Sequence, residues 1–483
     1  MINWKDERNL SLLADFYEFT MANGYLKEKV HEHITYFDLY FRSVPDKGGF
    51  AIFAGLEQFV KYIKNLHFEE DDIEYFKSKG IFSDEFIDYL KNFEFECDVW
   101  AMEEGTVVFP NEPLLIVRGP AIQAQMIETM ALILINHQTL IATKTNRIVK
   151  SADGRSVMEF GSRRAQGADA ATIGARAAYI GGVVGSANAY ADKLYGVPAL
   201  GTMAHSWVMM FENEYEAFRA YAETFPDDTT LLVDTYDTLK SGIPNAIKVF
   251  DEVLKPMGKR PAGIRLDSGD IAYLSKKARK MLDEAGYEDC KIVASSALDE
   301  FKIKDMLDQG AKVDSFGVGE RLITSMSHPV FGGVYKLVAT EEDGNITPKI
   351  KISENVEKIT TPGFKQVYRF YDNDDNKAIA DLVCLHEEEI TDDEIEIFHP
   401  VHTWKRKTLT NFHTKKLLVP IFEKGKLVYE LPSLEDIKKN KEREVNTLWE
   451  EVQRFEFPHI YIVDLSQKLW EMKNDMINKT KIF

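Results

Sequence analysis

One pattern recurs through the middle of this 483-residue chain: a short apolar run that ends in small, polar or charged residues. Examples are SVMEFGSRRAQG from Ser156, LLVDTYDT from Leu231, GIRLDSGD from Gly263, KIVASSALDE from Lys291 and VDSFGVGER from Val313. Helix-like segments separate these runs at a spacing of roughly 20 to 45 residues, which is the length of a strand–helix unit. Because strands buried on both faces are continuously apolar, the pattern predicts parallel strands alternating with helices.

The number of these units indicates how the sheet is organised. About six or seven of them favour an irregular (β/α) barrel, in which functional side chains follow the carboxyl ends of the strands. An open, doubly wound sheet is the alternative, and such a sheet more often carries a GxGxxG fingerprint before its first helix. The sequence has no complete fingerprint there, so we expect an α/β protein built on a barrel.

The chain is too long for one compact core, and two or three domains are expected. Residues 1–147 are predicted to form an α/β domain. It includes a small β module near residues 98–120, where apolar pairs are broken by glycine and proline. Residues 148–340 are predicted to form the barrel. Residues 341–483 are predicted to be a C-terminal region of antiparallel strands that packs on the N-terminal domain and ends in an amphipathic helix.

Composition and charge exclude several classes of partner and location. A net charge of −19 argues against nucleic acid or an anionic membrane as the main partner. Polar residues interrupt the longest apolar stretch, residues 126–144, which therefore indicates a buried helix rather than a membrane span. The charged start has no apolar signal core, and the three cysteines include no CxxC pair, which is typical of a reduced compartment. We expect a soluble, cytoplasmic protein.

Residues 197–207, VPALGTMAHSW, are the most informative single segment. An apolar run becomes glycine and threonine and then presents His205 beside Ser206. Small residues there would let backbone N–H groups and one imidazole approach a ligand. A lone histidine after a strand is more often a core residue, but the recurrence of polar strand ends favours a functional histidine.

Taken in order, these and other motifs resemble the nicotinate phosphoribosyltransferase family. The matching motifs are LADFYEFTMANGYL, EGTVVFPNEPLLIVRGP, EFGSRRAQG, GTMAHS, RLDSGD, GVGERLITS and GGVYKL, between about residues 12 and 340. The resemblance implies that nicotinate is joined, through its ring nitrogen, to 5-phosphoribosyl 1-diphosphate. The products would be nicotinate mononucleotide and pyrophosphate, in NAD biosynthesis and salvage. A pyridine nitrogen has a free lone pair, so catalysis must come from positioning and from stabilising the leaving pyrophosphate.

The resemblance also implies which residues bind nicotinate. Tyr17 and Phe160 are similar to the aromatic residues that stack on opposite faces of the ring, with Tyr17 supplied by the neighbouring subunit of a homodimer. Arg265 is expected to grip the carboxylate in a bidentate fork, since a guanidinium matches that geometry. Thr202 is expected to be a second nicotinate contact.

Other residues are expected to bind the phosphoribosyl diphosphate. Arg163 and Arg164 follow the EFG turn, Gly317 and Gly319 would let backbone N–H groups approach an anion, and Thr324 matches a phosphoribosyl contact.

The acidic residues near this turn are harder to assign. Glu320 is expected to point away from the phosphates or to help hold a metal. Asp267 and Asp270 have three roles open: binding Mg²⁺, binding the ribose hydroxyls, or orienting Arg265. Mg²⁺ or Mn²⁺ is expected to arrive with the phosphates, so no metal ligand is assigned, and no tightly bound organic cofactor is expected.

The resemblance implies that His205 takes a phosphoryl group from ATP and couples ATP hydrolysis to product formation, which makes the enzyme ligase-type. A neutral imidazole is a competent nucleophile for this step. The sequence has no GxxxxGK[ST] loop, so we expect ATP to share the pocket of the sugar diphosphate rather than to bind a P-loop.

Four other functions are alternatives to nicotinate phosphoribosyl transfer. Nicotinamide phosphoribosyltransferase is disfavoured by GTMAHS, and quinolinate phosphoribosyltransferase would need a denser set of basic residues. A barrel decarboxylase or aldolase would use a strand-end lysine, for which Lys336 is the only obvious candidate. A catalytically silent protein that binds nucleotides or a partner protein would show no ATP hydrolysis stimulated by nicotinate and the sugar diphosphate.

Overall fold

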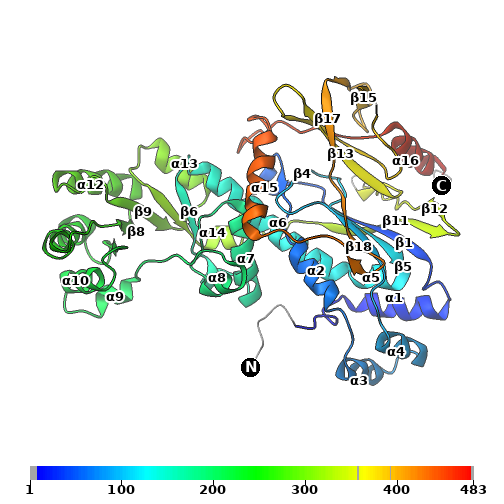
Figure 1. Cartoon of the computed structure of the whole chain (residues 1–483), viewed down its shortest axis with the longest axis horizontal. Coiled ribbons are helices and arrows are strands. Elements are labelled where there is room, and N and C mark those ends of the chain that lie inside the picture. Colours follow the sequence, from blue (N-terminus) through cyan, green and yellow to red (C-terminus); the bar gives the residue numbers. More distant parts are fainter. Residues whose placement is uncertain (1–7, 356–357, 392, 480–483) are drawn as a thin grey trace. The chain divides into compact units, whose positions relative to one another are not determined.

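The computed structural model describes residues 8–355, 358–391 and 393–479, and it has a mixed α/β fold (Figure 1). The chain divides into two compact units. Unit 1 combines Met1–Leu140 with Val330–Phe483, and unit 2 is Ile141–Pro329. The three-part division expected above remains a prediction.

A seven-stranded sheet organises unit 1, and every neighbouring pair in it is antiparallel. Its strands, in spatial order, are β12 (Asn345–Pro348), β11 (Val334–Glu342), β1 (Ile34–Tyr40), β5 (Leu115–Pro120), β3 (Asp98–Ala101), β18 (Val419–Glu423) and β19 (Lys426–Leu427). β1 is almost wholly buried, and its Phe37 stacks on Tyr335 of β11 with ring centroids 4.9 Å apart. Strands β3 and β5, which carry the predicted β module, are therefore central members of a larger sheet.

Helices of the N-terminal segment pack with this sheet. They are α1 (Phe16–Lys27), α2 (Leu56–Lys64), α3 (Glu70–Lys79), α4 (Asp84–Lys91), α5 (Ala121–Met126) and the start of α6 (Glu128–Ser151). The apolar stretch at residues 126–144 lies almost wholly in α6, which begins at Glu128 after a turn at Ile127, and a helix was expected there. Within the residues that the structure describes, no helix is both long and apolar enough to cross a membrane.

The C-terminal segment of unit 1 adds a second sheet with the order β17-β13-β14-β20. Its strands are β13 (Lys365–Asp372), β14 (Ala378–Leu385), β17 (Phe412–Lys416) and β20 (Val463–Leu465), and the hairpin β15 (Glu394–Phe398)–β16 (Arg406–Thr410) stands apart. The predicted amphipathic helix is α15 (Leu434–Thr447), which Ser433 caps by accepting the N–H of Asp436. A further helix, α16 (Gln467–Lys479), follows it.

Unit 2 contains the predicted parallel strand–helix repeats (Figure 1). The strands are β6 (Ser156–Glu159), β7 (Thr230–Leu232), β8 (Gly263–Leu266), β9 (Lys291–Ser296) and β10 (Ser315–Val318), in the order β6-β10-β9-β8-β7. The connecting helices include α7 (Ala168–Gly181), α8 (Ala189–Tyr195), α10 (Glu214–Thr224), α11 (Ile243–Val249), α12 (Ile271–Glu284) and α13 (Glu300–Asp308). The α/β fold class is confirmed.

The strand order also bears on the barrel. β10 pairs with β6, which joins the last strand to the first, and parallel bridges Glu159–Ser186 and Ser186–Ala199 extend the ring beyond β6. Among the described residues, no backbone pairing joins the segment at Ala199 to β7. The ring of parallel strands is thus irregular, and pairing does not close it at that point.

Candidate active site

The carboxyl ends of the parallel strands in unit 2 surround a cavity of about 280 Å³. Parallel strands bring their carboxyl ends to one edge of a sheet, so residues far apart in the sequence meet there. The cavity is lined by Phe160, Arg163, Arg164, Arg265, Asp267, Ser295, Ser296, Ala297, Gly317, Gly319 and Glu320. Eight of the residues named in the sequence analysis are in this set.

Arg265 is the centre of the site. It lies on β8, with its side chain 15% exposed. Its Nε donates to Ser295 Oγ (2.8 Å), and its Nη2 donates to Asp267 Oδ1 (2.9 Å). Its Nη1 donates to Thr202 Oγ1 (2.9 Å) and to the carbonyl of Met203 (3.2 Å). A guanidinium has five N–H groups, so one remains, and a bidentate grip on a carboxylate requires one of these partners to be exchanged.

Phe160 and Gly317 form one contact. The Arg265 guanidinium carbon lies 5.9 Å from the centroid of the Phe160 ring. A Cβ atom built at Gly317 would lie 2.5 Å from the same ring. Gly317 is therefore required for the ring position itself, a role that the sequence did not predict for it.

Asp267 links the guanidinium to the imidazole. Its Oδ1 also accepts a hydrogen bond from Ser295 Oγ (2.5 Å), and its Oδ2 lies 3.7 Å from His205 Nε2. Burial raises the pKa of Asp267, but the hydrogen bonds from Ser295 and Arg265 and the attraction of Arg265 and His205 outweigh it and lower the pKa overall. Asp267 is consequently a carboxylate at neutral pH.

His205 begins the short helix α9 (His205–Met209), and its side chain is 40% exposed. The ring Nδ1 lies 3.2 Å from Thr235 Oγ1, and Nε2 lies 4.0 Å from Asp234 Oδ1. The imidazole thus has a hydroxyl on one nitrogen and the carboxylates of Asp234 and Asp267 on the other.

Sequence reasoning missed several residues of the site, among them Ser295, Thr235 and, closest to the imidazole's chemistry, Asp234. Its side chain is 2% exposed, and its Oδ2 accepts hydrogen bonds from the Asp267 N–H (2.9 Å) and Ser268 Oγ (2.6 Å). Within the described part of the chain, its Oδ1 has no hydrogen-bond partner. The signal was available, because Asp234 ends the apolar run LLVD at a strand terminus, as the other site residues do.

The predicted phosphate-binding residues are only partly gathered at the cavity. Arg163 and Arg164 are exposed at its edge, and Arg164 Nε lies 3.7 Å from Glu320 Oε2. Thr324 is not among the lining residues, and its hydroxyl donates to the carbonyl of Glu320 (2.6 Å). Glu320 thus faces a cation of the site.

Two other candidates have different surroundings. Asp270 caps α12, because its side chain accepts a hydrogen bond from the Tyr273 N–H (2.9 Å). This helix-capping contact gives the side chain a structural role. Tyr17 belongs to unit 1, where it lies on α1 and is 43% exposed. Its contact with nicotinate in a neighbouring subunit stays a prediction.

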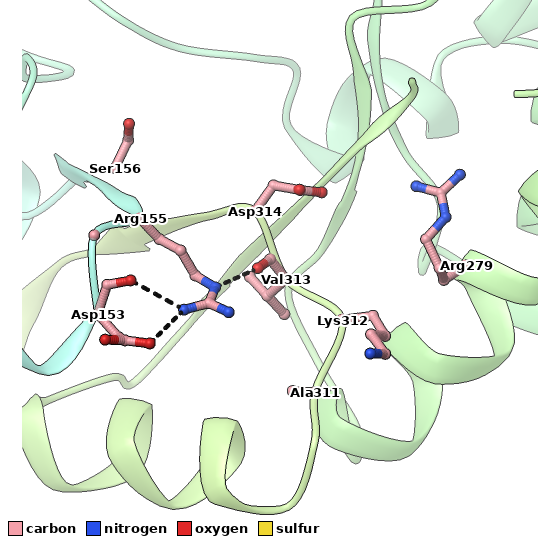
Figure 2. A pocket seen from close by; sticks show the side chains of 9 residues that line it. Asp153, Arg155, Ser156, Arg279, Ala311, Lys312, Val313 and Asp314 are labelled. Carbon is pink, nitrogen blue, oxygen red and sulfur yellow. Dashed lines mark hydrogen bonds and ion pairs between the residues drawn. The ribbon is translucent and has the colours of Figure 1, made fainter. Parts of the chain in front are cut away.

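A second cavity in unit 2, of about 540 Å³, lies at the opposite ends of the strands, beside Ser156 and Asp314. Figure 2 shows its two arginines. Arg155 donates to the carbonyls of Val313 and Asp153, and Arg279 donates to the carbonyls of Cys290 and Tyr287. Both arginines therefore hold neighbouring loops together through backbone carbonyls. Their guanidinium groups have few N–H donors left for a ligand.

The fold and the first cavity together define a class. A guanidinium, an aromatic ring, an imidazole and two carboxylates at the carboxyl ends of parallel strands are typical of an α/β enzyme that binds a small anionic substrate.

Comparison with known proteins identifies the family. The family model described as "Nicotinate phosphoribosyltransferase (NAPRTase) family" matches residues 155–378. The models of its N-terminal and C-terminal domains match residues 12–136 and 364–473.

Individual relatives agree with these matches. The nicotinate phosphoribosyltransferase of Bacillus subtilis is 47% identical, over 99% of this chain and 97% of its own. The crystal structure of the human nicotinic acid phosphoribosyltransferase superposes with a TM-score of 0.85 at 29% identity, over 96% of this chain and 99% of that chain. A nicotinate-nucleotide pyrophosphorylase from Pyrococcus furiosus (TM-score 0.70, 24% identity, 92% and 97% coverage) shares the fold. The chain belongs to the nicotinate phosphoribosyltransferase family, which confirms the resemblance seen in its motifs.

Proposed function

We propose that this protein is a nicotinate phosphoribosyltransferase, which converts nicotinate and 5-phosphoribosyl 1-diphosphate into nicotinate mononucleotide and pyrophosphate. Family membership supports the reaction. The observation that carries the assignment of the site is Arg265 beside the Phe160 ring in the strand-end cavity. A cation and an aromatic face are what a flat, aromatic carboxylate requires.

The chemistry asks these residues to position groups rather than to move protons. The nitrogen lone pair of nicotinate attacks C1 of the sugar, the bond from C1 to the pyrophosphate oxygen breaks, and pyrophosphate leaves with the electron pair. Phe160 covers one face of the ring, and Arg265 orients the carboxylate with Thr202. When the carboxylate takes the place of Asp267 on Arg265, Asp267 is released toward the sugar, where its negative charge stabilises a cationic ribosyl carbon.

We also propose that ATP phosphorylates His205. The carboxylates of Asp234 and Asp267 face Nε2 and favour the tautomer that keeps its proton there, so Nδ1 carries the lone pair. In the structure this lone pair faces the Thr235 hydroxyl, and that contact is given up when ATP binds. Nδ1 then attacks the γ-phosphorus, an N–P bond forms, and the bond to the bridging oxygen breaks, so that ADP leaves. The product ring is cationic, and the two carboxylates stabilise it.

A divalent cation is part of this proposal. Among residues 8–355, 358–391 and 393–479, no group of three or more His, Cys, Asp or Glu side chains is arranged to hold a metal ion. We therefore propose that Mg²⁺ or Mn²⁺ is held mainly by the phosphate oxygens of the substrates. Asp267 and Glu320 are the carboxylates that line the cavity. The ion would neutralise charge on the leaving pyrophosphate.

A substrate comparison tests the reaction. The purified protein is incubated with 5-phosphoribosyl 1-diphosphate, Mg²⁺ and either nicotinate or nicotinamide, with and without ATP, and the mononucleotide products are separated and quantified. We expect nicotinate mononucleotide to form, ATP hydrolysis to rise when both substrates are present, and nicotinamide to react poorly. Equal turnover of nicotinamide would contradict the substrate assignment. Product formation that ATP leaves unchanged would contradict only the coupling.

A further inference from the structure

Unit 1 contains a cavity of about 860 Å³, the size of a small-molecule site. Four chain segments form its walls: residues 43–49, residues 109–111, the β15–β16 hairpin, and residues 458–464. All of them belong to unit 1, whereas Arg265 and His205 belong to unit 2. The proposed reaction uses none of these segments.

One side of the cavity is apolar and aromatic. Phe109 and Tyr461 stack with ring centroids 3.9 Å apart and planes 8° apart. The Tyr461 hydroxyl donates to Asp381 (2.9 Å), which fixes the ring pair. Val401 and Ile460 also line the cavity and are 68% and 87% exposed. Phe109 and Tyr461 are only 1% and 8% exposed, so the ring pair supports this wall from behind. The exposed Val401 and Ile460 provide the surface for a flat apolar group.

The other side is basic, because four cations line the cavity: Lys47, Lys405, Arg406 and Lys407. Arg406 is paired with Glu396. Among the described residues, no carboxylate pairs with Lys405 or Lys407, and Lys407 Nζ lies 5.8 Å from the centroid of the Trp449 ring. An excess of unpaired ammonium groups beside an apolar wall favours a ligand with an acidic group.

Asp464 and His399 are two further polar residues of the lining. Asp464 is 4% exposed, and burial raises the pKa of its carboxyl group to about 6, with no charge or hydrogen bond of the described residues opposing this effect. His399 Nδ1 accepts the N–H groups of Val401 (3.1 Å) and His402 (3.0 Å), so its Nε2 is a donor. The cavity therefore also offers a hydrogen-bond acceptor, the Asp464 carboxyl group, and a hydrogen-bond donor, His399 Nε2.

We propose that this cavity is a second ligand site, which binds a small amphipathic anion. An aromatic or heteroaromatic ring lies against the exposed side chains of Val401 and Ile460, and an acidic group meets Lys405 and Lys407. Asp464 accepts a hydrogen bond from an N–H or amino group on the ring. Its negative charge repels the acidic group of the ligand, which therefore lies at the basic side.

A pair of dyes that differ in one charge tests the proposal on the full-length protein. The probes are 8-anilinonaphthalene-1-sulfonate and the neutral N-phenyl-1-naphthylamine, each titrated by fluorescence. The double variant Lys405→Glu, Lys407→Glu should weaken binding of the sulfonate by about tenfold or more, because two attractive charges become repulsive. It should change the affinity for the neutral dye by less than about twofold, since only the charge differs. Added salt should weaken only the anionic dye.

The matched control is Lys439→Glu, Lys468→Glu, which makes the same change of net charge at exposed positions on α15 and α16 of the same unit. This control should bind both dyes as the wild type does. Circular dichroism melting curves establish that each variant is folded. Nicotinate and 5-phosphoribosyl 1-diphosphate should leave the bound sulfonate in place, so the outcome is independent of the proposed reaction.

Displacement of the bound sulfonate shows whether the acidic group of the ligand is a carboxylate or a phosphate. If 2-naphthoate displaces it better than naphthyl phosphate, the site prefers carboxylates, and the reverse order identifies a phosphate site. The proposal is wrong if the wild type binds neither dye, as it would if a second copy of the chain covered the cavity. It is also wrong if the control variant loses affinity as strongly as the Lys405, Lys407 variant.

Discussion

At the scale of single residues, we expect Arg265 to discriminate nicotinate from nicotinamide. A carboxylate paired with a largely buried guanidinium is worth on the order of 2–5 kcal/mol when one partner is truncated. Arg265→Ala should therefore lower kcat/KM for nicotinate by roughly 30-fold or more, at about 1.4 kcal/mol per factor of ten. The activity with nicotinamide should change much less, and Arg265→Lys should rescue part of the loss because a point charge cannot form a fork. Equal losses for both substrates would place Arg265 on the sugar diphosphate instead.

His205 and Asp234 give a second prediction at this scale. With γ-³²P-labelled ATP, acid-labile and base-stable phosphate should appear on the wild type and be absent from His205→Ala. Asp234→Asn keeps the shape of the side chain but removes the charge beside Nε2, so labelling should be about tenfold slower while KM for nicotinate changes little. Label that persists in His205→Ala would refute the phosphohistidine. An unchanged labelling rate in Asp234→Asn would mean that the charge of Asp234 does not assist phosphorylation and that the residue has only a structural role.

At the scale of elements, the contact between β10 and Phe160 predicts the effect of one methyl group. Gly317→Ala places a Cβ 2.5 Å from the Phe160 ring, and overpacking of this kind costs about 1–3 kcal/mol. We expect a lower free energy of unfolding in urea and a higher KM for nicotinate. Gly24→Ala is the control, since no atom lies within 4 Å of its Cβ position and α1 tolerates alanine. Normal stability and KM in Gly317→Ala would contradict the role given to this contact.

The junction between α1 and α6 should make stability depend on pH. Glu18 Oε1 accepts from the Thr129 N–H (3.1 Å) and Oγ1 (2.5 Å), and burial raises the pKa of Glu18 from 4.5 to about 7. Because the folded pKa is the higher one, the contribution of this group is fully present below pH 4.5 and is lost as the pH rises to about 7. Glu18→Gln should remove about 1–3 kcal/mol of this pH dependence. Urea unfolding between pH 4.5 and 8 measures it, and parallel curves for both proteins would contradict it.

At the scale of the whole molecule, the proposed homodimer predicts complementation between subunits. If Tyr17 completes the pocket of a neighbouring subunit, Tyr17→Ala and Arg265→Ala proteins are each inactive, but a mixed dimer contains one intact site. Mixing them under conditions of subunit exchange should restore up to about a quarter of the wild-type activity, since half of the dimers are mixed and each has one site. Exchange is verified by mass spectrometry of tagged subunits. Full exchange without recovered activity would mean that each chain builds its own pocket.

Much of unit 2 and of its site could be predicted from the sequence. The apolar runs that end in polar residues located the strands of unit 2, and the ordered motifs identified the family. Both predictions succeed because strand burial and motif order are readable from short stretches of chain. Arg265, Asp267 and Phe160, which those motifs singled out, line the strand-end cavity, and His205 lies beside Asp267, while their roles stay predictions. Asp234 had the same local signal and was overlooked, whereas the hydroxyl of Thr324 is bonded to the carbonyl of Glu320, which no local pattern indicates.

The sequence by itself determined the alternation of strands and helices in unit 2 and the family, because both depend on short stretches of chain. Only the tertiary structure decided which distant segments pair. β1 lies between β5 and β11, and β18 joins β3 across more than 300 residues, because antiparallel partners are selected by burial of shared apolar faces. The tertiary structure also decided that four contacts occupy Arg265 and that Asp234 faces His205, since such contacts depend on the distances between strand ends.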